Sequence, residues 1–281
     1  MVSFYVRSAM AFALLGLAGC GGGGGGGGDD GVSTPPPITN LPDNATTTLN
    51  GQSISAAYDP DSITSVTAGE ASTTLTTRDG QVVAVSLTAP DTNIAFAVSN
   101  GDIIRQNASA VVATSGTGDA ELGLSNGYQH QTFGVWIEGD PTTSGVVGAG
   151  SFGRKTTSPL SGTASYTGTS AGYLQQGTNR YVTSSTIEVT TPDFKEVTIN
   201  STNTRAVSVT AGELPNAGDY NFTGTGIVSG SGFKADVNGT VATISGSANG
   251  QFYGPTAEEV GGTFALQGSD GQYLGAFGAR Q

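Results

Sequence analysis

One serine lies in a pattern that hydrolases use for nucleophilic catalysis. The segment GLSNG, residues 123–127, matches the Gly-x-Ser-x-Gly nucleophile elbow around Ser125. That motif works where a strand turns sharply into a helix, and it needs an acidic residue and then a histidine far downstream. His130 is the single histidine of the chain and follows Ser125 by only five residues. We therefore predict that Ser125 is not a catalytic nucleophile.

A second segment has the spacing of a dinucleotide-binding fingerprint. Residues 148–153 read GAGSFG, which matches Gly-x-Gly-x-x-Gly. The fingerprint binds a pyrophosphate only where a strand leads into the N-terminus of a helix, inside a β-α-β unit. No helical periodicity follows the segment, so we predict a glycine-rich strand.

Acidic side chains raise two further possibilities. Glu258 and Glu259 are paired carboxylates, the groups that glycosidases use for acid–base catalysis. Adjacent residues in a turn diverge and no cleft is indicated, so we expect solvated turn charges. The turn 59–61, Asp-Pro-Asp, could bind calcium weakly, but such pairs are mostly solvated turn residues. Zinc or copper would need several Cys or His ligands, and the chain has one of each. We predict that the protein is not an enzyme and holds no metal.

Haem is a separate alternative, because both histidine and tyrosine serve as axial ligands of haem iron. His130 and nine tyrosines are available. His130 lies in the polar segment NGYQHQT, ahead of a strand-like run, so we expect a solvated loop histidine. The residues predict no bound cofactor, and haem stays open as an alternative.

Cys20, the only cysteine, lies at the end of an export signal. Residues 1–8 carry one positive charge, Arg7, and residues 9–18 form a small, apolar run. That run is too short to cross a hydrocarbon core of about 30 Å. The segment LAGC, residues 17–20, resembles the bacterial lipobox, which implies cleavage after residue 19 and lipidation of Cys20. The alternative is an ordinary secretory signal that ends near a cysteine.

Residues 20–40 are predicted to form a lipidated, unstructured tether. Eight glycines, 21–28, follow Cys20, and three prolines occupy 35–37. Glycine tracts behave as random coil, and proline runs add an extended spacer. Because Gly21 follows Cys20, the aspartate that resembles an inner-membrane retention signal is absent. We therefore expect a lipid anchor in the outer membrane.

The charge of the chain excludes one class of partner. Its formal net charge is −12, with 22 Asp and Glu against 10 Lys and Arg, and removal of Arg7 makes it more negative. Phosphate backbones are bound by clustered basic side chains, and anionic lipid headgroups repel acidic proteins. We predict no nucleic-acid partner, and membrane attachment through lipid alone.

From residue 41 onward the pattern predicts an all-β protein. Short runs rich in Thr, Val and Ile alternate in polarity and are broken by Gly, Asn, Asp or Pro. In one run Val83, Val85 and Leu87 share a face, and in the run 133–138 Trp136 lies opposite its apolar neighbours and is expected in a core. Pro159 marks a junction between a β-rich unit over 41–158 and closely spaced hairpins over 159–281, and the pattern leaves a barrel or a sandwich open.

One long motif resembles a known family. The segment GQFYGPTAEEVGGTFAL, residues 250–266, resembles the signature of the C-terminal β-barrel domain of transferrin-binding-protein-B-like lipoproteins. The segments 161–173, 185–201, 220–240 and 275–281 agree with that family in order, and 185–201 resembles its hairpin through an Asp-Phe turn at Asp193 and Phe194. The segments 133–139 and 148–156 resemble the handle that precedes the barrel. The alternation also puts Phe264 and Leu266 on one face of a strand.

The resemblance implies a fold and a function. The fold would be an antiparallel β-barrel of about eight strands at the C-terminus, preceded by a smaller, handle-like β domain. The function would be that of a single-lobe, surface-exposed, outer-membrane lipoprotein that captures an iron source or related solute, such as host transferrin or haem. Its partners would be a TonB-dependent transporter and a lipoprotein translocator. The alternative is a structural or adhesive surface lipoprotein without a small-molecule pocket.

Overall fold

The computed structural model describes residues 41–59, 62–64, 66–140, 143–208 and 212–281. In these ranges the regular structure is β-strand, apart from two short 3-10 turns, η2 (Val98–Asn100) and η3 (Ala217–Tyr220). No helix in this part of the chain has the length and apolar character needed to cross a membrane. The predicted signal peptide, Cys20 and the tether over 20–40 lie outside the described residues. The all-β prediction is confirmed.

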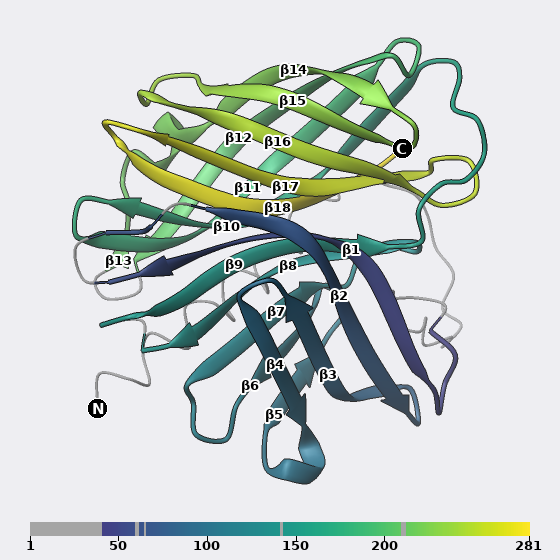
Figure 1. Ribbon diagram of the computed structural model, residues 1–281, viewed down its shortest axis with the longest axis vertical. Helices are drawn as coiled ribbons and strands as arrows, with labels where there is room; N and C mark the ends of the chain where they lie inside the picture. The colour runs from purple at the N-terminus through teal and green to yellow at the C-terminus, as the bar shows by residue number, and fades with distance from the viewer. Residues whose placement is uncertain (1–40, 60–61, 65, 141–142, 209–211) are drawn as a thin grey trace, which may run out of the picture.

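The first nine strands form one antiparallel sheet, which we call the handle sheet. They are β1 (Thr46–Tyr58), β2 (Thr67–Arg78), β3 (Gln81–Ala89), β4 (Thr92–Ala97), β5 (Ile103–Gln106), β6 (Ala110–Thr114), β7 (Ala120–Ser125), β8 (Gln131–Gly139) and β9 (Gly145–Gly153). Their order is β4-β3-β2-β1-β9-β8-β7-β6-β5. The two edge strands, β4 and β5, are joined through η2, so the sheet curls until it is nearly closed (Figure 1).

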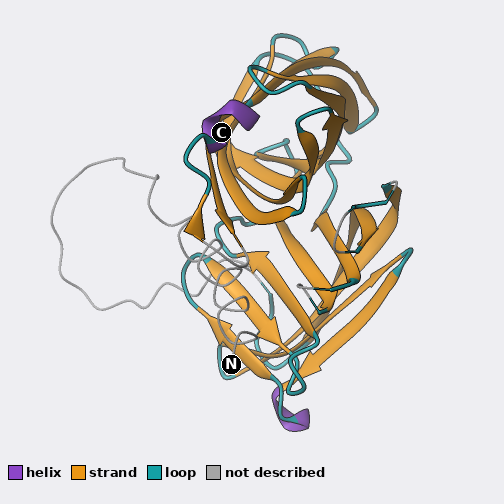
Figure 2. Cartoon of the chain, turned by 90° about the vertical axis from the view of Figure 1, so that its left-hand side faces the viewer, coloured by secondary structure: helices purple, strands orange, loops and turns teal. Residues whose placement is uncertain are grey.

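The remaining strands form a closed barrel. They are β10 (Ala164–Gln176), β11 (Asn179–Thr191), β12 (Glu196–Ser208), β13 (Gly212–Glu213), β14 (Phe222–Ser229), β15 (Gly232–Gly239), β16 (Ile244–Tyr253), β17 (Glu259–Gly268) and β18 (Gly271–Arg280). The order is β11-β10-β18-β17-β16-β15-β14-β12, and pairing of β11 with β12 closes the ring of eight strands, with β13 added beside β12. Figure 2 shows the ring nearly end-on, beside the handle sheet. The predicted barrel of about eight strands is confirmed.

Side chains of strand β8 alternate between the two faces of the handle sheet, and each face packs in a different hydrophobic core. Phe133 and Val135 face the barrel and pack with apolar side chains of β10 and β18. Trp136 points the other way, is 1% exposed, and lies in the handle's own core, as predicted. Gly148, opposite Trp136 on β9, leaves room for the indole, because a Cβ there would lie 2.2 Å from Trp136 Cζ2.

The predicted face of β3 is wrong at one position. Val85 and Leu87 are buried as expected, but Val82 joins them in the core and Val83 is only partly buried. The register between β2 and β3 shifts beside Thr76 and Thr77, which is the signature of a β-bulge. A bulge inserts one residue into the alternation and so moves the preceding side chains to the opposite face.

The barrel interior is filled by aromatic and aliphatic side chains. Phe264 and Leu266 of β17 both point inward, so their predicted shared face is confirmed. The ring of Phe264 lies 4.9 Å, centroid to centroid, from both Phe222 and Tyr273. Aromatic rings at such separations pack favourably beyond their buried area. Side chains therefore fill the interior of the barrel and form its hydrophobic core.

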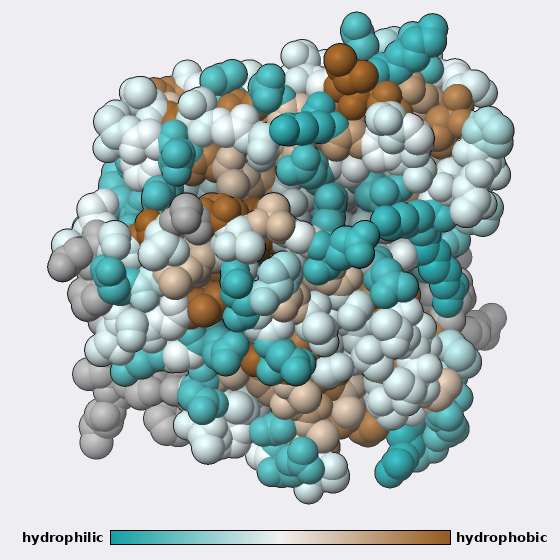
Figure 3. Space-filling model, viewed as in Figure 1, coloured by the Kyte–Doolittle hydropathy of each residue, from teal (hydrophilic) through white to brown (hydrophobic). Residues whose placement is uncertain are grey.

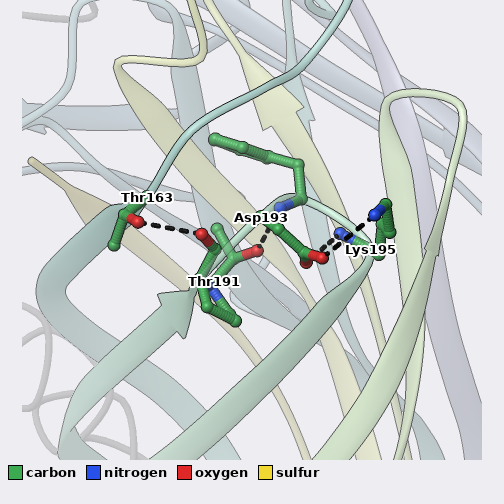
Figure 4. A network of polar contacts seen from close by, with 6 residues as sticks. Thr163, Thr191, Asp193 and Lys195 are labelled. Carbon is green, nitrogen blue, oxygen red and sulfur yellow. Dashed lines mark hydrogen bonds and ion pairs between the residues drawn. The ribbon is translucent and has the colours of Figure 1, made fainter.

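The turn between β11 and β12 is held by side-chain hydrogen bonds and one ion pair (Figure 4). Phe194 has a φ of 54°, and its backbone N donates to Thr191 Oγ1 at 2.8 Å. Asp193 accepts from the backbone N of Lys195 at 2.9 Å and pairs with its ammonium at 3.4 Å. Thr163 adds a bond to the Pro192 carbonyl at 2.8 Å. The predicted hairpin through residues 193 and 194 is confirmed.

Candidate functional site: the junction of handle and barrel, and the barrel groove

Glu259, at the start of β17, is a buried carboxylate that joins the barrel to the handle sheet. It is 3% exposed. Its Oε1 accepts a hydrogen bond from the backbone N of Gln129 at 2.6 Å, and its Oε2 accepts one from the backbone N of His130 at 2.9 Å. The expectation of a solvated turn charge is therefore wrong for Glu259, because the loop between β7 and β8 covers it. Glu258 stays partly exposed and accepts from the backbone N of Thr256 at 2.9 Å.

Buried polar side chains continue this junction along β17. Gln131 is 2% exposed and donates from Nε2 to the carbonyl of Val260 at 2.8 Å. Ser151 Oγ and Tyr253 OH, both fully buried, lie 3.0 Å apart. Gly261 makes room for this contact, because a Cβ there would lie 1.9 Å from Gln131 Oε1 and 2.6 Å from Ser151 Oγ. The handle's polar side chains thus occupy the space of a missing barrel side chain.

Burial governs the electrostatics of the junction. Burial raises the pKa of Glu259 above its ordinary value, although the backbone N–H groups of Gln129 and His130 act against the rise. Burial likewise raises the pKa of Tyr128 to about 12, and the Tyr128 hydroxyl donates to the carbonyl of Gly278 at 2.5 Å. The junction therefore disfavours charge and holds Glu259 through oriented backbone donors.

A second contact between the two sheets surrounds Arg180 of β11. Arg180 is 4% exposed and donates to the backbone carbonyl of Asp59. Its guanidinium lies 4.7 Å over the ring of Tyr58, whose ring stacks with Tyr173 at 6.4 Å. Cations are attracted to aromatic faces, more strongly where water is excluded. The end of β1 is therefore fastened to the barrel wall as well.

The structure separates the residues that suggested enzymatic chemistry. Ser125 ends β7, is 4% exposed, and is followed by a loop in which no described hydrogen bond joins it to His130. The segment 148–153 lies within β9, between β1 and β8, as the predicted glycine-rich strand. His130 is partly buried at the junction, and its carbonyl accepts from the backbone N of Arg154 at 2.8 Å. His130 therefore lies in a loop, as expected, but it is partly buried and not fully solvated.

Metal ligation has little support in the described part of the chain. No group of three or more His, Cys, Asp or Glu in these ranges is placed to hold a metal ion. In the turn considered for calcium, Asp59 Oδ1 accepts from the backbone N of Ser62 at 2.8 Å. Pro60 and Asp61 lie outside the described residues.

A groove of about 1050 Å³ runs over the outer face of β12, β14, β15 and β16. Gln52 of β1 forms its edge and donates to the carbonyl of Asn249 at 2.8 Å. The lining is rich in hydroxyl, amide and charged side chains, and it includes Ile227, which is 71% exposed. The face of the molecule in Figure 3 is likewise mainly polar, with small, separated apolar patches. The groove offers a contact surface of mixed polarity, from which Ile227 projects. His130 does not line it.

A smaller groove of about 370 Å³ lies where the segment after β1 meets β16, β17 and β18. Ile63, Val66 and Leu274 give it a more apolar lining. Its volume falls within the range of small-molecule pockets.

Sequence reasoning missed the junction, although one signal for it exists. Four of the outward positions of β17 and β18 that face the handle are small, namely Gly261, Ala265, Ala276 and Gly278, and Leu274 packs among them. The outward positions of β15 are long and polar, for example Lys234 and Asp236. A row of small outward residues on a barrel indicates that another layer packs there. That signal locates the contact but does not single out Glu259.

The barrel portion matches one protein family. Residues 158–281 match the family described as the C-lobe and N-lobe β-barrels of transferrin-binding protein B. This segment is a transferrin-binding-protein-B-like β-barrel domain. No curated protein matches the chain at the sequence level.

Several solved structures resemble the chain with its transferrin-binding-protein-B-like barrel. Transferrin-binding protein B of Haemophilus parasuis Hp5, as the Trp-176-Ala mutant, is 12% identical with a TM-score of 0.48, covering 85% of this chain and 77% of that one. The isotype 1 protein of serogroup B Neisseria meningitidis is 16% identical with a TM-score of 0.47, covering 81% and 43%. The N-lobe of lactoferrin-binding protein B of Moraxella bovis is 14% identical with a TM-score of 0.38, covering 66% and 81%. These likenesses are distant and identify no ligand of this chain.

Proposed function

We propose that this protein is a surface-exposed, outer-membrane lipoprotein that acts as a binding module for an iron source or related solute. The observation that carries the proposal is the match of residues 158–281 to the barrels of transferrin-binding protein B. In this proposal residues 1–19 are a cleaved signal, Cys20 is lipidated, and 20–40 form the tether. Residues 41–158 are the handle domain and 159–281 the barrel domain. The captured solute, a host protein such as transferrin or haem, passes to a TonB-dependent transporter.

The open groove on the barrel supports a protein rather than a small solute as the bound partner. Its volume of about 1050 Å³ lies at the upper end of the range of small-molecule pockets, and hydroxyl, amide and charged side chains line it beside exposed Ile227. Exposed Ile227 could enter a pocket on a partner, while Thr225 and Asp236 beside it could form hydrogen bonds at the rim. The same openness is the feature that favours the alternative function, a structural or adhesive surface protein.

Anchoring is tested by Cys20→Ala in the full chain. Several buried acyl chains hold a protein on a membrane far more firmly than one chain does. We expect the variant to be soluble or retained with an uncleaved signal, and to lack radiolabelled palmitate. Normal membrane fractionation with an unchanged mass would refute the lipoprotein assignment.

Capture is tested with cells that display the protein, incubated with transferrin, lactoferrin and haem. Asp236→Lys reverses a charge inside the groove, whereas Asn238→Lys adds the same side chain on β15 outside it. We expect capture of one of these probes by the parent, a loss with Asp236→Lys, and little change with Asn238→Lys. Capture of none of the probes favours the adhesive alternative, and equal capture by both variants removes the groove from the proposal.

A further inference from the structure

Glu259 differs from an ordinary surface carboxylate in what holds it. One residue at the start of a barrel strand supplies both acceptor oxygens to two consecutive backbone N–H groups of a handle loop. These groups are separated from Glu259 by about 130 residues in sequence, so the bonds exist only while the handle lies against the barrel. The carboxylate is 3% exposed, and water can replace these bonds only when the loop leaves.

We propose that Glu259 makes the docking of the handle sheet onto the barrel dependent on pH. A carboxylate can accept at both oxygens, whereas a protonated carboxyl presents a donor at one of them. The two backbone N–H groups can only donate. Protonation therefore removes one hydrogen bond across the junction and also removes a buried charge. The balance of these two effects decides whether acid strengthens or weakens the docking of the handle sheet.

The charged groups around Glu259 come from both sides of the junction. On the barrel, Glu258 precedes it in the same turn, and Arg280 lies opposite it on β18 and donates to the Gly127 carbonyl at 3.2 Å. On the handle, His130 and Tyr128 belong to the covering loop. The connection after β9 adds Arg154 and Lys155, which pair through their backbones with Gly254 and Tyr253.

The direction of the effect follows from burial. Burial raises the pKa of Glu259 above its ordinary value of 4.5, which applies when the residue is undocked and solvated. Proton uptake is then favoured in the docked state, so this group's contribution to docking grows as pH falls towards 4.5 and is lost as pH rises through the raised pKa. Acid therefore strengthens the junction through Glu259.

The neighbouring Glu258 has the opposite dependence and makes a matched control. Burial raises its pKa, but hydrogen bonds from the backbone N–H groups of Thr256 and Glu258 and from the Thr256 side chain, together with nearby His130, outweigh this and leave the pKa below the ordinary value. The contribution of Glu258 to stability is present above the ordinary pKa of 4.5 and is lost as pH falls through the lowered pKa. Adjacent residues of the same type are thus expected to respond in opposite directions.

The experiment compares Glu259→Gln and Glu258→Gln in the full chain carrying Cys20→Ser, from about pH 7.5 to about pH 4.5. Urea midpoints report stability, and hydrogen exchange of the Gln129 and His130 amides reports the junction itself. As pH falls, we expect the urea midpoint of the parent to rise relative to that of Glu259→Gln. Over the same range, the urea midpoint of the parent should fall relative to that of Glu258→Gln. Protection of one of the two amides should drop by about tenfold in Glu259→Gln only, because a glutamine side chain keeps one acceptor oxygen and presents a donor NH₂ group in place of the other.

Two results overturn the proposal. One is a difference in urea midpoint between the parent and Glu259→Gln that stays constant or falls as pH decreases. The other is unchanged protection of both amides in a folded Glu259→Gln variant. If that variant does not fold, carbon NMR of the Glu259 carboxyl in the parent decides instead, because a pKa at or below 4.5 contradicts the proposal and a higher one supports it.

Discussion

Gly261→Ala is the sharpest test of how barrel and handle fit together. The added methyl carbon would lie 1.9 Å from Gln131 Oε1, 2.6 Å from Ser151 Oγ and 2.9 Å from the carbonyl oxygen of Phe277. Gln131 cannot swing into solvent, because it is 2% exposed and bonded to the carbonyl of Val260. The side chain must therefore shift and lose that hydrogen bond.

The magnitude follows from two effects. Overpacking a filled site costs about 1–3 kcal/mol, and breaking a buried neutral hydrogen bond costs about 1 kcal/mol more. We expect Gly261→Ala to lower the free energy of unfolding by roughly 2–4 kcal/mol. Gly218→Ala is the control, because a Cβ at Gly218 meets nothing within 4 Å.

The assay is urea unfolding of the single and double variants in a thermodynamic cycle. Gln131→Ala alone removes the bond to Val260 and leaves a space beside Gly261. In the double variant the new methyl group occupies that space, so the two losses should not add, and the coupling should favour the double variant by about 1–3 kcal/mol. Additive losses, or a Gly261→Ala variant as stable as Gly218→Ala, would refute this account of the junction.

Two further predictions concern the core and the buried tyrosines. Phe264→Ala should lower the free energy of unfolding by about 3–5 kcal/mol, because it empties the centre of the barrel. Ile227→Ala should have almost no effect, because that side chain is 71% exposed. Equal urea midpoints for these two variants would contradict the register of β17. Burial raises the pKa of Tyr128 to about 12, so the unfolded chain loses this proton first and stability should fall as pH rises above about 10. Tyr128→Phe should make that fall less steep in urea titrations, and an unchanged slope would show that Tyr128 is not desolvated.

Local patterns in the sequence were sufficient to predict the strands and the residues that share a face. Alternation along 133–138 placed Trp136 correctly, and the spacing of Phe264 and Leu266 placed both on one face, which lies inside the barrel. These predictions succeed because the alternation of side chains across a strand is a property of the strand itself. The motif over 250–266 likewise indicated the family now matched by residues 158–281.

The same reasoning failed where a neighbour distant in sequence decides the outcome. Val82 replaces Val83 in the core because a bulge against β2 shifts the register, and no residue within β3 signals the bulge. Glu258 and Glu259 are adjacent glutamates in one turn, yet one is partly exposed and the other buried. The difference comes from the loop that carries Gln129 and His130, which reaches Glu259 only after both sheets have formed.

The sequence by itself therefore determined the strand content and the sharing of faces along each strand, since these depend on polarity along the strand, and the barrel was indicated by the resemblance of residues 250–266 to a known family. Only the tertiary structure decided which outward faces meet. The small outward residues of β17 and β18 permit the handle to approach, but Gln131 and Ser151 fill the space at Gly261 only because the handle sheet lies against that wall. Contacts between surfaces far apart in sequence depend on shape and on backbone donors, which a residue's neighbours along the chain do not specify.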